Sequence, residues 1–229
     1  MSENRERCDV GLKKQQGIQS VKFEEPPIIC AAASVVGQKE GDGPFGDVFD
    51  QIESDPKVGG DTWEDAEGRL QERAAELAIQ KAGCGKEAIR YIVAGDLLGQ
   101  LMASSFGLAG FDKPLFGVYG ACSTMGESIG IGSMLVEGGF ADYVLAMTSS
   151  HFASAEKQFR FPLGYANQRP KASTWTVTGS GAVVICKGDQ KQGMAKITGI
   201  TTGKIVDYGV KDTMNMGACT VSYTHLTLP

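Results

Sequence analysis

Residues 114–151, PLFGVYGACSTMGESIGIGSMLVEGGFADYVLAMTSSH, contain the pattern that decides the fold. The apolar run PLFGVYG predicts a buried strand, TMGESIGIGSMLVEGG predicts a helix, and ADYVLAMTSSH predicts a further strand. Uninterrupted apolar strands that alternate with helices are typical of a parallel sheet covered on both faces. This stretch therefore predicts an α/β fold.

The sequence on either side extends the same alternation. Upstream, AIRYIVAGD (residues 88–96) predicts a strand and LGQLMASSFGLAG (residues 98–110) predicts a helix. Downstream, TVTGSGAVVICKG (residues 176–188) predicts a fourth strand. Nearer the N-terminus, VKFEEPPIICAAASVVG (residues 21–37) predicts short extended segments that the two prolines interrupt.

The clearest helix lies in residues 61–85, DTWEDAEGRLQERAAELAIQKAGCG. Thr62 and Asp65 have the spacing of a capping box, apolar residues recur at helical intervals, and Gly83 supplies a stop signal. We therefore expect this helix to begin directly after Thr62 and to end at Gly83.

Composition excludes several classes of protein. The chain has 229 residues, a hydrophobic fraction of 42% and a formal net charge of −5, which leaves no basic surface for nucleic acid. Its six cysteines form no CxxC pair, so neither a zinc site nor a redox dithiol is predicted, and we expect no cofactor. There is no secretory signal and no run of 18 apolar residues, so we expect an intracellular protein without a membrane span.

Cys122 is the first candidate for a functional residue. It follows the second predicted strand, and Thr124 and Glu127 have capping-box spacing, so the next helix is expected to begin near Thr124. This places Cys122 and Ser123 at the carboxyl edge of the sheet and near a helix N-terminus, where α/β proteins bind ligands and anions. Three roles stay open for Cys122: an acyl-carrying nucleophile, one wall of a ligand pocket, or a small buried residue.

Two further residues are predicted at the same edge. His151 ends the third strand and Asp96 ends the first, although a lone histidine is more often structural and Asp96 can equally cap the following turn. Arg160, Arg169 and Lys171 follow His151 and are candidate counter-charges for an anionic ligand. Taken singly, each of these cations more commonly points into solvent.

Three segments carry a resemblance to a known family: GACSTMGES, TSSHFASAEKQFRFP and TVTGSGAVVI. Together they resemble the thiolase-like superfamily and, more closely, its branch that serves sporulation in endospore-forming bacteria. The resemblance implies two similar βαβαβ halves and a homodimer. It aligns Cys122 with the family cysteine, and it places His151, Phe159 and Arg160 in the matching loop.

The resemblance also implies a function. Proteins of the sporulation branch bind dipicolinic acid (pyridine-2,6-dicarboxylate) and help to move it, with calcium, into the developing spore. They work with membrane proteins of the same operon at the inner spore membrane. The expected ligand-binding residues are Cys122, Ser123, His151, Phe159, Arg160 and Asp96. One alternative is an acyl-transferring condensing enzyme with Cys122 as nucleophile, and another is a scaffold for membrane partners.

The chain is expected to have four parts. Residues 1–17 form a polar arm, residues 18–187 a thiolase-like N-terminal half, and residues 188–220 the start of a second half. Residues 221–229, VSYTHLTLP, do not resemble the family and are expected to be a non-native tail, so His225 is given no catalytic role. The second half is therefore expected to be truncated, and we expect the truncated product to aggregate or to unfold without cooperativity.

Overall fold

The computed structural model describes residues 14–159, 175–188, 193–207, 209 and 211. Its core is one seven-stranded sheet with the order β4-β3-β8-β7-β5-β6, to which β9 adds beside β3. The strands of this sheet are β3 (Ile28–Gly37), β4 (Gln51–Glu53), β5 (Ile89–Gly95), β6 (Leu115–Gly117), β7 (Tyr143–Ser150), β8 (Gly179–Cys186) and β9 (Ala195–Lys196). The predicted α/β class is confirmed.

Strand direction follows from the pairing. Strand β4 pairs parallel with β3, and both β6 and β7 pair parallel with β5. Strand β8 pairs antiparallel with both β3 and β7, and β9 is antiparallel to β3. Strands β3 to β7 therefore share one direction, and all of them end at the same edge of the sheet.

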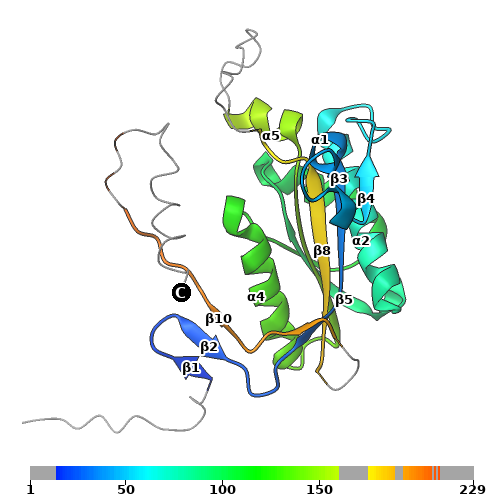
Figure 1. Ribbon diagram of the computed structural model, residues 1–229. Helices are drawn as coiled ribbons and strands as arrows, with labels where there is room; N and C mark the ends of the chain where they lie inside the picture. Colours follow the sequence, from blue (N-terminus) through cyan, green and yellow to red (C-terminus); the bar gives the residue numbers. More distant parts are fainter. Residues whose placement is uncertain (1–13, 160–174, 189–192, 208, 210, 212–229) are drawn as a thin grey trace, which may run out of the picture.

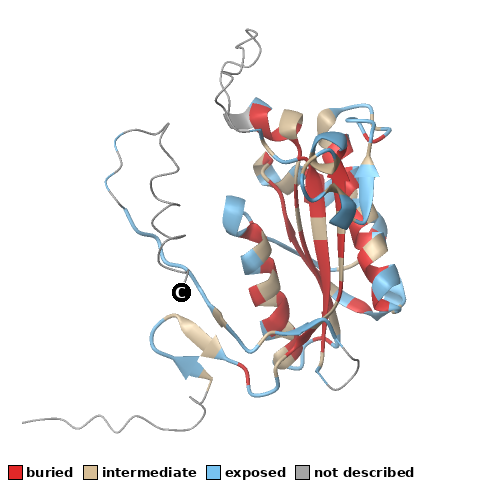
Figure 2. Ribbon diagram, in the orientation of Figure 1, coloured by how far each residue is buried: buried red, intermediate tan, exposed pale blue. Residues whose placement is uncertain are grey.

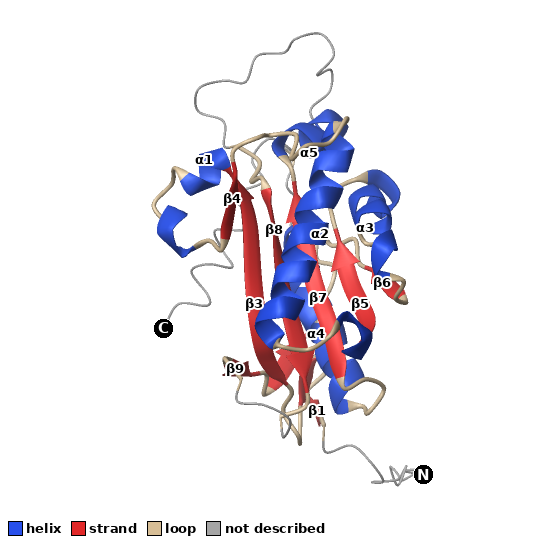
Figure 3. Ribbon diagram, turned by 90° about the vertical axis from the view of Figure 1, so that its right-hand side faces the viewer, coloured by secondary structure: helices blue, strands red, loops and turns tan. Residues whose placement is uncertain are grey.

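Helices cover both faces of the sheet (Figures 1 and 3). Helix α2 (Trp63–Ala82) packs on one face together with α3 (Met102–Gly107), and α4 (Thr124–Glu137) packs on the other. The remaining helical segments are α1 (Gln38–Gly41), α5 (Phe152–Phe159), η1 (Gly46–Val48), η2 (Lys86–Ala88), η3 (Gly99–Leu101), η4 (Ala109–Phe111) and η5 (Ala121–Ser123). The buried residues lie along the sheet and the inner sides of α2 and α4 (Figure 2).

Helix α2 begins and ends where its sequence predicts. The Thr62 hydroxyl accepts a hydrogen bond from the Asp65 amide at 3.1 Å, which satisfies one of the free N–H groups of the first turn. Gly83 ends the helix with φ of 61°, a left-handed conformation that glycine adopts without steric cost. Ala66, Leu70 and Ala74 are fully buried, so this stripe joins α2 to the sheet.

Four details differ from the sequence-based expectations. Strand β3 is a ten-residue central strand rather than a set of short segments, because the prolines lie just before it. The predicted fourth strand, β8, is antiparallel to its neighbours. The predicted helix at 98–110 is divided into η3, α3 and η4, since Gln100 and Leu101 have positive φ. The second predicted strand shortens to the three residues of β6.

A second, smaller sheet joins distant parts of the chain. It contains β1 (Gln15–Gln16), β2 (Ser20–Lys22) and β10 (Gly199–Thr201) in the order β1-β2-β10, all antiparallel. Main-chain hydrogen bonds therefore tie the segment after residue 187 to the start of the chain. The domain boundaries expected near residues 17 and 187 stay predictions.

Candidate functional site

The structure brings three predicted site residues to one edge of the sheet. Asp96 follows β5, Cys122 lies in η5 after β6, and His151 follows β7 directly. Because these three strands run in the same direction, their carboxyl ends share the edge that leads into α5 in Figure 1. The crossover rule therefore gave the right position for each residue.

Cys122 is exposed on this edge. It lies in η5, and the next residue, Ser123, is the N-cap of α4. The preceding residue, Ala121, has φ of 50°, a conformation that is uncommon for residues with a Cβ atom. Such strain is concentrated at functional sites, so it supports a role for this loop beyond packing.

The start of α4 carries a negative charge as well. The Ser123 hydroxyl donates to the Gly120 carbonyl at 2.8 Å and also contacts the Glu127 carboxylate. Helix α4 begins at Thr124 as predicted, but Glu127 is held by Ser123 and not by a capping box with Thr124. A carboxylate in the first turn offsets part of the attraction that a helix N-terminus exerts on an anion.

Asp96 is buried and its carboxylate is occupied. One oxygen accepts from the Leu98 amide at 2.8 Å, and the other accepts from the amide and hydroxyl of Ser104 at 2.8 and 2.6 Å. The side chain therefore holds the turn between β5 and α3. This geometry matches the turn-capping alternative for Asp96.

His151 is enclosed rather than open to the edge. Its Nε2 lies 2.8 Å from the Pro56 carbonyl, and its Nδ1 accepts from the Ala153 amide at 3.2 Å. The ring stacks with Phe152 at 4.9 Å and lies 5.6 Å from Trp63 of α2. Burial lowers the pKa of the imidazole below its ordinary value, so the neutral ring is favoured.

Cys122 and His151 adjoin helices that pack on opposite faces of the sheet. His151 packs against Trp63 of α2, whereas Cys122 precedes α4 on the opposite face of the sheet. The expectation that both residues contact one ligand stays a prediction. Cys122 and Ser123 are the exposed candidates among the predicted residues that the structure describes.

The other predicted residues are described only in part or not at all. Phe159 is the last residue of α5, and nothing is described of its side chain. Arg160, Arg169 and Lys171 lie outside the described residues. Their ligand contacts stay predictions. Among the residues described, no three His, Cys, Asp or Glu side chains gather in a way that could hold a metal ion.

A buried polar cluster under this edge escaped the sequence-based prediction. Glu67 and Gln71 lie one turn apart on α2, and both are fully buried. They connect through hydrogen bonds to Ser149 at the end of β7 and to Ser104 of α3. The sequence did contain a signal for this cluster: both residues lie beside the apolar stripe of α2, and polar residues that are buried there need hydrogen-bond partners.

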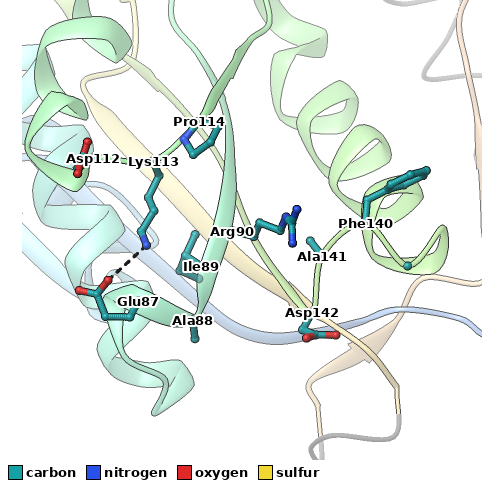
Figure 4. Close-up of a pocket in the computed structure, with 11 residues that line it drawn as sticks. Glu87, Ala88, Ile89, Arg90, Asp112, Lys113, Pro114, Phe140, Ala141 and Asp142 are labelled. Atoms are coloured by element: carbon teal, nitrogen blue, oxygen red, sulfur yellow. Dashed lines mark ion pairs between the residues drawn. The ribbon is translucent and has the colours of Figure 1, made fainter.

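Cavities occur at both ends of the sheet. One, of about 530 Å³, lies at the amino ends of β5 and β7, where Lys113 pairs with Glu87 and Arg90 lies between the strand and Phe140 (Figure 4). It is therefore at the end of the sheet opposite Cys122. Another, of about 280 Å³, lies near the carboxyl ends of β3 and β4, with Phe152 and Trp175 in its wall.

Comparison with known proteins identifies the family. The family model described as stage V sporulation protein AD matches residues 17–227. This chain belongs to the stage V sporulation protein AD family. The match agrees with the predicted sporulation branch. The matched range includes residues 221–227, which were expected to be non-native and which lie outside the described residues.

A curated relative supports the family. The chain is 42% identical over 205 residues to stage V sporulation protein AD of Bacillus subtilis (strain 168), which covers 90% of this chain. The aligned part is 60% of the relative, so the chain spans less than two thirds of that protein. Within the described residues, no helix has both the length and the apolar character needed to cross a membrane.

Two solved structures have a similar arrangement over part of this chain. One is 3-oxoacyl-[acyl-carrier-protein] synthase III from Aquifex aeolicus VF5, with 15% identity, a TM-score of 0.49, and coverage of 72% of this chain and 55% of that one. Another is the priming β-ketosynthase of the R1128 polyketide pathway, with 16% identity, a TM-score of 0.46, and coverage of 76% and 53%.

Proposed function

We propose that this chain takes part in binding dipicolinic acid for its uptake, with calcium, into the developing spore. The observation that carries the proposal is membership of the stage V sporulation protein AD family over residues 17–227. The exposed loop at the carboxyl edge of the sheet supports it, because Cys122 and Ser123 stand at the start of a 14-residue helix. A helix start of this kind offers free N–H groups to a carboxylate.

Local charge limits how the ligand binds. Glu127 places a carboxylate beside Ser123, and a second carboxylate, Asp96, ends the neighbouring strand. A free dianion would be repelled by both groups, whereas calcium bound to the ligand carboxylates would cancel that repulsion. The proposal therefore includes stronger binding of dipicolinate in the presence of calcium, with Arg160 as a further predicted contact.

Calorimetric titration with dipicolinate, with and without calcium chloride, tests this function. We expect saturable binding that Cys122→Ala, Ser123→Ala or Arg160→Ala weakens about tenfold, which corresponds to about 1.4 kcal/mol. Ser105→Ala, an exposed serine of α3, is the matched control and should bind like the parent. A folded chain that gives no saturable heat under either condition contradicts the proposal.

Incubation with acyl-CoA and intact-mass measurement tests the enzymatic alternative. Exposure of Cys122 is the observation that favours it, since a thioester nucleophile must be accessible. An acyl adduct that Cys122→Ala abolishes supports a condensing enzyme. Dipicolinate binding without an adduct supports the binding protein.

Homodimer formation is part of the proposal. Strand β6 is the last strand of the sheet, and its residues Leu115 and Phe116 are 38% and 44% exposed. An exposed edge strand with apolar side chains is a ready surface for a second chain. Light scattering should give twice the monomer mass, and Phe116→Lys should give the monomer. We also propose that membrane proteins of the same operon, at the inner spore membrane, are partners.

A further inference from the structure

Glu67 is a fully buried carboxylate at the junction of three elements. It belongs to α2, and its two oxygens accept from Ser149 of β7 at 2.8 Å and from Ser154 of α5 at 2.5 Å. We name these three residues the Glu67 cluster. The cluster ties the end of β7 and the first turn of α5 to α2.

The hydrogen bonds around the cluster have a defined direction. The Gln71 amide nitrogen donates to Ser149 at 2.7 Å and to Ser104 at 3.0 Å. The Ser149 hydroxyl donates a hydrogen bond to Glu67, and the Ser104 hydroxyl donates one to Asp96. Each serine therefore accepts from Gln71 and donates to a carboxylate, which is the pattern expected when both acids act as acceptors.

The charged groups near Glu67 do not compensate its burial. Its own helix contributes Glu64, which pairs with Lys157 of α5 at 2.5 Å, and β5 contributes Asp96. Helix α5 also carries Glu156, and His151 after β7 favours the neutral state. Within the described part of the chain, Glu67 has no lysine or arginine partner. Burial raises the pKa of Glu67 to about 7, although both serine hydrogen bonds act in the opposite direction.

The cluster can also accommodate a protonated Glu67. The Ser154 hydroxyl lies 3.3 Å from the His151 carbonyl as well as 2.5 Å from Glu67. When Glu67 binds a proton, Ser154 can donate to that carbonyl and accept the new proton from Glu67. The polar groups of Glu67 and Ser154 are then hydrogen-bonded in both protonation states, without movement of the backbone.

We propose that the protonation state of Glu67 controls whether the first turn of α5 packs against α2. The protonated side chain holds this turn against α2, and ionisation of Glu67 favours separation of the turn from α2, which we call opening. Opening brings water to Glu67 and removes the cost of a buried charge. The ordinary pKa of 4.5 applies when α5 is open and about 7 when it is closed. Ionisation therefore favours the open form increasingly as the pH rises above about 4.5, by roughly 300-fold in total, and the effect becomes constant above about pH 8.

His151 acts in the opposite sense and must be separated from Glu67. Its pKa is lowered in the closed form, so acidification below its ordinary value of 6.5 favours opening. The two effects overlap below about pH 6.5. A comparison of the parent with Glu67→Gln isolates the part due to Glu67, because His151 is present in both.

Hydrogen exchange of the full chain, followed by mass spectrometry for peptides within residues 148–157, tests the closure. At each pH, the ratio of opening constants between the parent and Glu67→Gln removes the intrinsic pH dependence of exchange. We expect this ratio to rise about five- to sevenfold per pH unit between pH 5 and 7 and to become constant near pH 8. Glu72→Gln, on the exposed side of the same helix, should give no pH-dependent ratio.

A second variant covers the case in which Glu67→Gln does not fold. Ser154→Ala removes one hydrogen-bond donor from the Glu67 carboxylate. The pH above which the opening constant no longer changes should therefore be higher than in the parent. A ratio for Glu67→Gln that does not change between pH 5 and 8 overturns the proposal. A Ser154→Ala variant that levels at the same pH as the parent overturns it as well.

Discussion

The role of Asp96 gives the sharpest prediction from the structure. Its carboxylate accepts three hydrogen bonds from buried donors, at 2.6 to 2.8 Å, and so fixes the turn between β5 and α3. In Asp96→Asn, one oxygen becomes an NH₂ group. If the remaining oxygen keeps Ser104, the new NH₂ faces the Leu98 amide, and two donors then meet in a buried site.

The cost follows from these bonds. Leaving a buried donor unsatisfied costs about 1–3 kcal/mol, and a hydrogen bond to a charged group contributes about 1.5–3 kcal/mol. We therefore expect Asp96→Asn to lower the free energy of unfolding by about 3 kcal/mol. If the chain unfolds cooperatively, which would contradict the aggregation expected from its sequence, a urea m value of about 2 kcal/mol per molar implies that the midpoint falls by roughly 1.5 M.

Urea denaturation followed by circular dichroism measures this change. Asp112→Asn is the matched control, because Asp112 is exposed with φ of 52°, a conformation that asparagine also tolerates. The control should differ from the parent by less than about 0.5 kcal/mol. If Asp96→Asn is equally mild, the turn-capping explanation is wrong. An unchanged stability with altered dipicolinate affinity would instead make Asp96 a ligand contact.

Three further predictions concern packing, accessibility and protonation. A Cβ on Gly107 would lie 2.7 Å from the Gly68 Cα, whereas a Cβ on Gly110 meets nothing within 4 Å. Gly107→Ala should therefore lower the melting temperature by several degrees, and Gly110→Ala should not. In native buffer, a maleimide should modify the exposed Cys122 rapidly and the buried Cys186 only after unfolding; equal rates would contradict the described burial. For His151, burial lowers the pKa in the folded state, so its stabilising contribution is present above pH 6.5 and is lost on acidification. Nuclear magnetic resonance should show a neutral imidazole at pH 6.5, and a charged ring at that pH would refute this.

Local sequence signals predicted much of the fold. Thr62 and Gly83 bound α2 because capping depends on residues adjacent in sequence. The sequence did not predict that β8 is antiparallel to its neighbours, since an apolar run is equally compatible with parallel and antiparallel pairing. The division of residues 98–110 was also missed, because Gln100 and Leu101 adopt positive φ and neither residue type signals that conformation in the sequence.

The alternation of side chains along β7 decides which face of the sheet each residue near the end of this strand occupies. Leu145 and Met147 belong to the core on the α2 side, while Val144 and Ala146 belong to the core on the α4 side. Ser149 continues the first set by bonding to Glu67 of α2.

The same alternation continues past the end of the strand. His151 is two residues beyond Ser149, and it packs against Trp63 of α2 as the odd-numbered series requires. Cys122, in contrast, precedes α4 on the even-numbered face. A ligand that contacts Cys122 on that face should therefore meet β7 through an even-numbered residue such as Ser150, with the imidazole behind the sheet. Under this reasoning, the imidazole does not contact the ligand. His151→Gln can lower the stability of this edge of the sheet, but the folded variant should bind dipicolinate with the affinity of the parent. A tenfold loss of affinity in a variant of unchanged stability would show that the imidazole reaches the ligand.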